Sequence, residues 1–356
     1  MSLPCGKKPI DCRWVYKVKY KADGSVERLK ARLVVKGYTQ KAGVDYTDTF
    51  SPVVKMTTIR SLIAVAVKKG WQLHQLDVNN AFLHRDLHEE IYMRLPQGLL
   101  SDMPNVVCKL QKSLYGLKQA SRQWYAKHAA VLYARGYHHS SNDYSLFYKK
   151  TPSSVVFLGV YVDDIPLTGN DLEEIQALKS YLDHVFKIKD LGEAHYFLGL
   201  EILPVPQGLV LTQRKFSKEL LEEFGNPAMT LVLTPLDSTQ KLGAEDGDLF
   251  EDPSLYRKLV AKLNFLTNTR PDLAFTIQHL SQFMQQPRVP HFKALLHVLR
   301  YLKYNPDLGI LLNNTADVSL TAYCDSDWTA CVHTRRLVSV YVIFFGHSLI
   351  SWKSKK

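Results

Sequence analysis

The sequence predicts a mixed α+β protein whose sheets are built largely from antiparallel hairpins. Pairs of β-prone runs are separated by short turns, as in residues 14–20 and 26–36 around Lys21–Ser25. Other segments carry apolar residues three and four positions apart, which predicts amphipathic helices. With 356 residues, the chain is long enough to form two or three subdomains.

Basic residues gather on the second strand of this N-terminal hairpin. Arg28, Lys30, Arg32 and Lys36 occupy even-numbered positions, and such positions share one face of a strand. This pattern is typical of a solvated edge strand. It also suits a surface that faces a polyanion, and the two interpretations stay open at this point.

Three helices are predicted before residue 190. Residues 57–69 have a helical apolar repeat that ends at Gly70. A second helix runs to about Arg135 and stops at Gly136. Asp171 is suited to cap a third helix, because acidic residues occupy its first turn.

Two adjacent acids, Asp163 and Asp164, interrupt an apolar segment that spans residues 155–168. Apolar runs of this kind predict buried strands, and a two-residue connection predicts a tight hairpin with both acids at its tip. The two carboxylates repel each other unless a cation neutralises them. Mg²⁺ does this well, since hard cations prefer carboxylate oxygens. A solvated turn is the simpler alternative.

A third acid, Asp77, follows a short predicted strand at residues 71–76. An acid at a strand end can face the hairpin across a sheet. Three carboxylates in that arrangement hold two metal ions for in-line displacement at phosphorus.

Asp77-Val78-x-x-Ala81-Phe82 and Tyr161-Val162-Asp163-Asp164 resemble the two metal-binding motifs of reverse transcriptases. Further segments resemble copia-type LTR-retrotransposon polymerases, and the similarity runs nearly end to end. These segments are Lys30–Val34, Phe50–Val53, Ser113–Ala120 and Phe197–Gly199. The resemblance implies a right-hand polymerase with fingers, thumb and an antiparallel palm sheet, followed by a truncated RNase H-like α/β segment.

The resemblance also implies roles for individual residues. The catalytic acids would be Asp77, Asp163 and Asp164, and with Val78 they would hold two Mg²⁺ ions, for which Mn²⁺ can substitute. The implied nucleotide-binding residues are Lys30, Arg32, Phe82, Tyr115 and Gly116, with Phe82 under the sugar, where it favours deoxynucleotides. The implied template and primer contacts are Lys118, Gln119, Tyr161, Phe197, Leu198 and Gly199.

A polar, acidic stretch at 236–253 predicts a linker. The implied organisation is fingers and palm at 1–235, this linker, a helical thumb and connection at 254–308, and a partial RNase H-like domain at 309–356. Helical patterns cover about 254–268, 271–285 and 291–304. Asp325 matches the first catalytic acid of RNase H. We expect no RNase H activity, because one carboxylate cannot assemble a two-metal hydrolytic site.

The net charge of +11 favours a polyanionic partner. The resemblance specifies an RNA template, a DNA primer or template, and deoxynucleoside triphosphates. The five cysteines form no C-x-x-C pair, which indicates free thiols in a reducing compartment. No apolar run approaches the ~20 residues that span a bilayer. We therefore expect a soluble intracellular protein without a membrane partner, located by resemblance in a cytoplasmic virus-like particle or the nucleus.

The predicted function is RNA- and DNA-templated DNA synthesis by a copia-type reverse transcriptase. The alternative is a degenerate, inactive relic that retains at most nucleic-acid binding. Two departures from the family pattern motivate this alternative. Arg85 stands where the family has a glycine, which suggests a strained turn with positive φ. Pro166 falls in the strand after the two acids, where proline removes a ladder donor.

Overall fold

The computed structural model describes residues 1–20, 25–101, 103, 105–226, 228–237, 239, 242–327 and 337–355. The chain divides into two compact units. Unit 1 comprises Met1–Val54 and Gln75–Gly192, and unit 2 comprises Lys55–His74 and Glu193–Lys356. The functional partition at 235, 253 and 308 remains a prediction.

The centre of unit 1 is a six-stranded sheet with the order β10-β3-β9-β8-β7-β6. Strands β6 to β9 follow one another as antiparallel hairpins, and the last of these, β8–β9, is the hairpin predicted within residues 155–168. The strands are β3 (Leu73–Val78), β6 (His138–His139), β7 (Leu146–Lys150), β8 (Val155–Gly159), β9 (Asp164–Gly169) and β10 (Ile188–Glu193).

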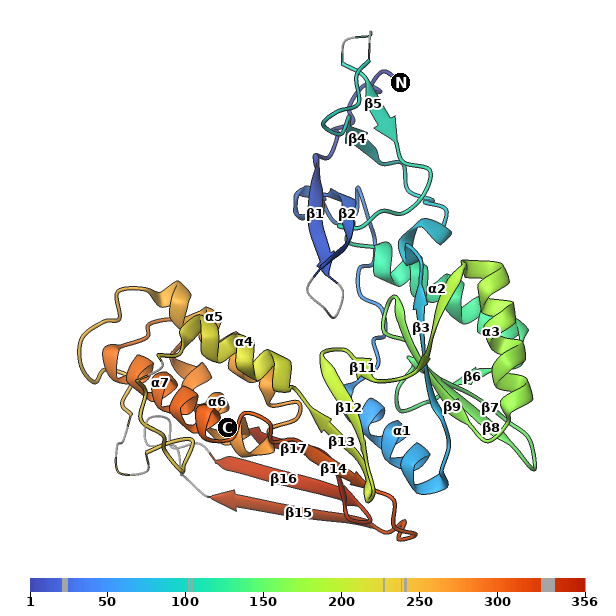
Figure 1. Cartoon of the computed structure of the whole chain (residues 1–356). Coiled ribbons are helices and arrows are strands. Elements are labelled where there is room, and N and C mark those ends of the chain that lie inside the picture. Colours follow the sequence, from blue (N-terminus) through green and yellow to red (C-terminus); the bar gives the residue numbers. More distant parts are fainter. Residues whose placement is uncertain are drawn as a thin grey trace. The chain divides into compact units, whose positions relative to one another are not determined.

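Helices α2 (Ala120–Ala134) and α3 (Leu172–Phe186) pack together on this sheet (Figure 1). Oδ1 of Asp171 accepts a 2.9 Å hydrogen bond from the backbone N–H of Glu174, which confirms the predicted cap. The rings of Trp124 and Phe186 meet at 4.9 Å between centroids. Because both side chains are buried, they tie the two helices into one core.

The N-terminal hairpin pairs β1 (Cys12–Tyr20) with β2 (Val26–Val35), and the predicted turn at 21–24 lies outside the described residues. Lys17 stands opposite Lys30, and Lys19 stands opposite Arg28. Directly opposite residues share a face, so both strands contribute cations to one surface, which we call the basic face. The basic face comprises Arg13, Lys17, Lys19, Arg28, Lys30 and Arg32.

Shorter elements complete unit 1. A 3-10 turn, η2 (Ala81–His84), follows β3. Strands β4 (Tyr92–Arg94) and β5 (Val107–Lys109) form a separate antiparallel pair. Their apolar side chains share a small core with Val35 at the end of β2.

Unit 2 contains helices α1 (Met56–Lys69), α4 (Arg214–Phe224), α5 (Pro253–Leu266), α6 (Ala274–Leu280) and α7 (Val289–Tyr304). Gly70 has φ +65 and ends α1 as predicted. The single helix predicted at 271–285 is wrong, since α6 is flanked by 3-10 turns at Pro271–Leu273 and Ser281–Phe283. The Ser281 hydroxyl donates a 2.6 Å hydrogen bond to the Ile277 carbonyl, and such side-chain bonds compete with helix continuation.

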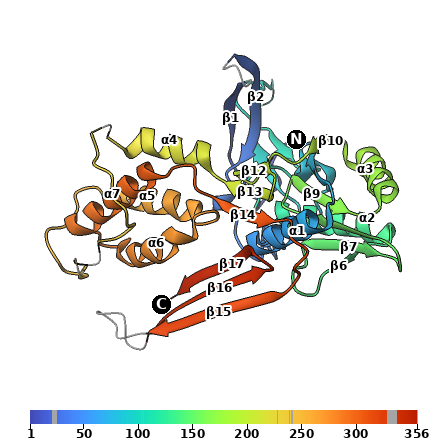
Figure 2. The same ribbon diagram turned by 60° about the horizontal axis from the view of Figure 1, so that its bottom comes forward.

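Among the described residues, unit 2 holds two sheets, and the strands of the second lie side by side in Figure 2. The first has the order β11-β12-β13-β14, and the second has the order β15-β16-β17. The strands are β11 (Tyr196–Phe197), β12 (Leu200–Val205), β13 (Gly208–Thr212), β14 (Ile310–Asn313), β15 (Leu320–Asp327), β16 (Val338–Phe345) and β17 (Ser348–Lys355).

Within the described residues, no helix has the length and apolar character needed to cross a membrane. Cys5, Cys12, Cys108 and Cys324 are free thiols. Cys331 lies outside the described residues.

Candidate active site

The two predicted acids lie at the turn between β8 and β9, but one residue away from the expected register. Tyr161 and Asp164 exchange two backbone hydrogen bonds of 2.9 Å each. Val162 and Asp163 therefore form the corner, and Asp164 is the first residue of β9. The prediction of both acids at the tip was wrong, because Val162 adopts the left-handed region with φ +52. A β-branched residue rarely does so, and the sequence gives no sign of it.

Hydrogen bonds to its backbone also attach the turn Tyr161–Asp164 to its neighbours, and we call it the catalytic turn after its predicted role. The backbone N–H of Val78, next to Asp77, donates to the Asp163 carbonyl at 2.8 Å. Nε1 of Trp124 donates to the Val162 carbonyl at 2.9 Å. Sequence reasoning missed Trp124, since an aromatic residue within a helix usually indicates core packing.

Hydrogen bonds reach both acids of the turn. The Tyr115 hydroxyl donates to Oδ2 of Asp163 at 2.9 Å, and Nε2 of Gln75 donates weakly to Oδ1 of Asp164 at 3.4 Å. Burial raises the pKa of Asp163, Asp77 raises it further, and the Tyr115 hydrogen bond opposes both effects. Burial and then Asp77 raise the pKa of Asp164. The site therefore disfavours its own negative charge when no cation is near.

The donor chemistry fits a divalent cation. Oδ1 of Asp163 is buried and lacks a hydrogen-bond partner among the described residues. A buried carboxylate oxygen with mutually repelling acidic neighbours is the kind of ligand that Mg²⁺ accepts. However, no group of three or more His, Cys, Asp or Glu side chains in the described ranges is placed to hold a metal ion. The ligand types are present, and the coordination geometry implied by the resemblance is not shown.

Tyr115 connects the acids to the predicted nucleotide-binding residues. Its ring meets that of Phe82 edge-on, with centroids 4.6 Å apart, and the Arg32 guanidinium carbon lies 4.9 Å from its centroid. Burial and the neighbouring Arg32 lower the pKa of Lys30, while Asp77 opposes this effect. The structure thus brings Lys30, Arg32, Phe82 and Tyr115 together beside the acids.

The backbone of Gly116 lies very close to another part of the chain, the carbonyl of Val35 at the end of β2. Gly116 has φ +95, and a Cβ there would lie 2.0 Å from the Val35 carbonyl oxygen. The Val35 N–H donates to the Tyr115 carbonyl at 2.8 Å. Gly116 therefore allows the end of β2 to join the segment that carries Tyr115.

Lys118 and Gln119 hold a neighbouring loop of unit 1. Nζ of Lys118 donates to the Gln40 carbonyl at 3.0 Å and to the Tyr46 hydroxyl at 3.3 Å. Gln119 is buried and donates to the Asp45 carbonyl at 3.1 Å. Their predicted contact with template remains a prediction.

The remaining predicted contacts lie at the catalytic turn and in unit 2. Tyr161 is exposed at the catalytic turn. In unit 2, Phe197 is buried, while Leu198 with φ +50 and Gly199 with φ +82 form a tight turn. This turn separates β11 from β12, and Phe197 pairs with Leu200 across it. Asp325 is exposed on β15.

The two departures from the family pattern behave differently. Arg85 has φ −113 and ψ 131, so the positive φ expected there is wrong and the residue carries no left-handed strain. Pro166 is buried in β9, a strand flanked by β3 and β8. Among the described residues, the regular pairing of β8 with β9 ends where Leu158 stands opposite Leu167, and one further bridge pairs Tyr161 with Asp164. Pro166, opposite Gly159, falls in the interruption.

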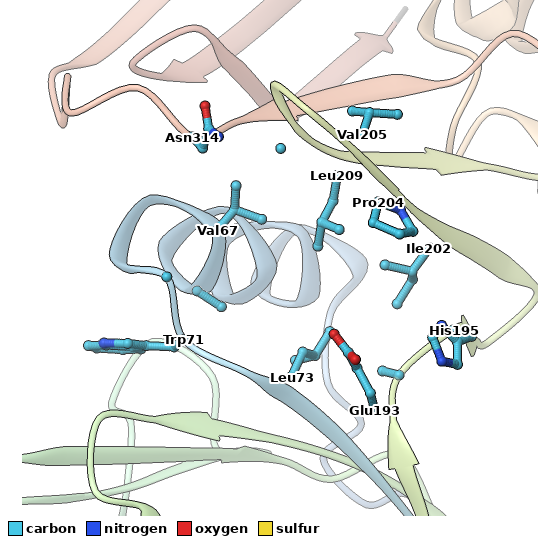
Figure 3. Close-up of a pocket in the computed structure, with 14 residues that line it drawn as sticks. Val67, Trp71, Leu73, Glu193, His195, Ile202, Pro204, Val205, Leu209 and Asn314 are labelled. Atoms are coloured by element: carbon cyan, nitrogen blue, oxygen red, sulfur yellow. The ribbon is translucent and has the colours of Figure 1, made fainter.

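Figure 3 shows a separate pocket in unit 2, between α1 and the β12–β13 hairpin. Trp71, Leu73, Ile202 and Pro204 form much of its apolar lining, and Glu193 is its acidic residue. The backbone N–H of Ala194 donates to the Leu73 carbonyl at 2.8 Å. None of the predicted site residues lines this pocket.

An acid-bearing hairpin beside a strand that carries a third acid, with a basic hairpin in the same unit, is the arrangement expected of a templated polymerase. Residues 1–238 match the family described as "Reverse transcriptase (RNA-dependent DNA polymerase)", and the chain belongs to this family. More narrowly, it is a copia-type retrotransposon Pol reverse transcriptase region.

The relatives are Pol polyproteins. Over 348 residues the chain is 44% identical to the "Retrovirus-related Pol polyprotein from transposon RE2" of Arabidopsis thaliana, covering 98% of this chain and 24% of that protein. It is 38% identical to the corresponding polyprotein from transposon TNT 1-94 of Nicotiana tabacum, covering 100% and 28%. The chain thus spans about a quarter of the length of these relatives.

Among solved structures, a foamy viral protease-reverse transcriptase in complex with double-stranded DNA aligns with a TM-score of 0.46 at 11% identity. The alignment covers 96% of this chain and 52% of that one. This likeness is too distant to assign roles to residues.

Proposed function

We propose that this chain is an RNA- and DNA-templated DNA polymerase that extends a primer 3′-hydroxyl with deoxynucleoside triphosphates. The observation that carries this proposal is the environment of Asp163. The residue forms the corner of a hairpin, its backbone is bonded to β3 beside Asp77, and its buried Oδ1 has no hydrogen-bond partner in the described part of the chain. A carboxylate held in this way is suited to a cationic ligand.

Asp77, Asp163 and Asp164, with the Val78 carbonyl, would hold two Mg²⁺ ions. When bound, such ions lower the pKa of the primer hydroxyl and neutralise the charge of the triphosphate and pyrophosphate. The chain itself positions the reactants, which is the larger part of catalysis in phosphoryl transfer. The hydrogen bonds to Val162 and Asp163 keep the catalytic turn in place.

The nucleotide would lie against the cluster around Tyr115. Lys30 and Arg32 supply positive charge for the triphosphate, and the ring of Phe82, packed on Tyr115, would limit space beneath the sugar. The basic face places like charges directly opposite each other, which is unfavourable without a polyanion. A nucleic-acid backbone relieves this repulsion. Phe197–Gly199 as primer contacts, and 309–356 as an RNase H-like segment, complete the proposal.

Primer extension tests this function. The purified chain is incubated with Mg²⁺, deoxynucleotides and a labelled primer on matched RNA and DNA templates. We expect extension on both templates, loss of extension in Asp163→Asn, and little extension with ribonucleotides. Failure to extend any primer, despite tight template binding, would refute the polymerase proposal.

Such a failure would favour a second candidate function, which is nucleic-acid binding without catalysis. The specific observation behind it is Pro166, which interrupts the pairing of a central strand two residues after Asp164. Binding that is unaffected by Asp163→Asn would support this candidate.

A further inference from the structure

We propose that Trp124 is a positioning residue that holds the catalytic turn in its left-handed conformation. This inference rests on the proposed polymerase function, and it holds that the indole N–H maintains part of the active-site geometry. Trp124 lies on α2, 39 residues before Asp163 in sequence, and touches the turn through the Val162 carbonyl at 2.9 Å.

The turn requires such support because of Val162. Its φ of +52 is a conformation that β-branched residues rarely adopt, and one that persists only where the surroundings impose it. The indole N–H fixes the direction of the Val162 carbonyl, and with it the peptide bond that leads into Asp163. Loss of this donor would let that peptide rotate and carry Asp163 with it.

The indole is itself held rigidly. Trp124 is 1% exposed, and its ring lies 4.9 Å from Phe186 and 5.4 Å from His128 between centroids. A donor locked by packing orients its partner better than a mobile side chain does. Since Phe186 is on α3, α2 and α3 together support the turn.

The other attachments of the turn do not replace this one. The Val78 N–H holds the Asp163 carbonyl, and the Tyr115 hydroxyl holds its carboxylate. Both bonds hold atoms of Asp163 that follow the Val162–Asp163 peptide bond in the chain, so neither fixes the backbone of Val162. Trp124 is the described side chain that bonds to the Val162 carbonyl.

Trp124→Phe removes the N–H donor and keeps an aromatic ring. We expect kcat for primer extension to fall about 10- to 100-fold, because a misplacement of ~1 Å costs on that order. The KM for deoxynucleotide should stay within about twofold, since the nucleotide contacts remain. Trp352→Phe is the matched control, because it removes the same kind of bond in unit 2, where Nε1 of Trp352 donates to the Thr267 carbonyl at 3.1 Å. It should leave kcat unchanged.

Hydrogen exchange provides a readout that is independent of activity. The N–H groups of Tyr161 and Asp164 each donate to the carbonyl of the other residue across the corner, so Trp124→Phe should accelerate their exchange about tenfold or more. Amides of the β7–β8 ladder should exchange at the same rate in Trp124→Phe as in the unmodified chain. If the unmodified chain extends no primer, the polymerase proposal fails while this measurement still decides the role of Trp124.

Two further variants separate positioning from folding. Benzothienylalanine at position 124 keeps the shape of the indole but has no N–H, and it should reproduce the losses of Trp124→Phe. In a Val162→Gly background, glycine adopts the positive φ without imposed support, so Trp124→Phe should cost less than about threefold in kcat. Equal losses in both backgrounds, or full kcat and protected turn amides in the benzothienylalanine variant, would overturn the proposal.

Discussion

The Tyr115 hydroxyl donates a 2.9 Å hydrogen bond to Oδ2 of Asp163, which couples the predicted nucleotide-binding cluster to a predicted catalytic carboxylate. This bond favours the ionised acid, but burial and Asp77 outweigh it and leave the pKa of Asp163 raised. Burial and Asp77 also raise the pKa of Asp164. Without metal, the site is therefore a source of instability at neutral pH.

Asp163→Asn should stabilise the metal-free chain. A carboxyl whose folded pKa lies above its unfolded value contributes stability that is complete below the unfolded pKa of about 3.9 and is lost as pH rises through the folded pKa. In EDTA at pH 7, the variant should therefore unfold at a higher temperature than the unmodified chain. The difference should shrink as the pH falls toward 4, which thermal unfolding across pH measures directly.

Mg²⁺ should reverse this order. An ion that binds only the folded chain adds about 2.7 kcal/mol at 100 times its Kd, and Asp163→Asn should lose most of this gain. Asp183→Asn, which changes an exposed acid on α3, is the control and should respond like the unmodified chain. If Asp163→Asn is less stable than the unmodified chain in EDTA at pH 7, the expected charge repulsion among the acids is contradicted.

Gly116→Ala should destabilise unit 1 more than Gly136→Ala does. Both glycines have positive φ, +95 and +80, but an added Cβ meets the Val35 carbonyl only at Gly116, since Gly136 has open space. Each alanine costs about 1–2 kcal/mol for the left-handed backbone, and the clash at Gly116 adds ~1–3 kcal/mol. Urea unfolding of the two variants measures the difference. Equal losses would show that β2 moves away from Tyr115 freely.

The sequence predicted those parts of the fold that depend on local pattern. The capped helix after Asp171, the end of α1 at Gly70 and the strands around the acids were confirmed, because periodicity and caps act over a few residues. Local pattern did not reveal that Val162, rather than Asp164, occupies the corner. Backbone strain of this kind is imposed by tertiary contacts.

Long-range contacts set the other limits of the sequence reading. The indole N–H of Trp124 bonds to the backbone carbonyl of Val162, and no pattern of side chains along the chain encodes such a bond. The sequence predicted only the part of the basic face that lies on β2, because the alternation of residues along a strand places Arg28, Lys30 and Arg32 on one side. The contribution of β1 required the register that sets Lys17 opposite Lys30.

Nucleic-acid binding should depend strongly on salt through the basic face. Each phosphate neutralised by a cation contributes about −0.9 to the slope of log K against log salt. Lys30→Gln should therefore reduce the magnitude of the slope by about 1, as fluorescence anisotropy with a labelled primer–template duplex would show. Lys149→Gln is the control, because Nζ of Lys149 already lies 2.9 Å from Glu174. An affinity insensitive to salt would argue against any nucleic-acid role.

Pro166→Ile should strengthen the sheet beneath the catalytic turn. The Asp164 N–H donates to Tyr161, and N–H groups two positions apart face the same neighbour, so the nitrogen of Pro166 faces β8 at Gly159. A restored donor is worth about 0.5–1.5 kcal/mol. Because Pro166 lies two residues from Asp164, we expect faster primer extension together with higher resistance to urea.

Three companion variants make this prediction specific. Pro166→Ala restores the donor without added bulk, so it separates the hydrogen bond from the packing of isoleucine. Pro204→Ile should gain nothing, because the Ile202 N–H donates to His195 and the nitrogen of Pro204, two positions on, therefore faces away from β13. Arg85→Gly should not increase activity either, since Arg85 has φ −113 and glycine relieves no strain there. If Pro166→Ile and Pro166→Ala both leave stability and extension unchanged, the interruption at Pro166 is harmless, and any weakness of this polymerase lies elsewhere.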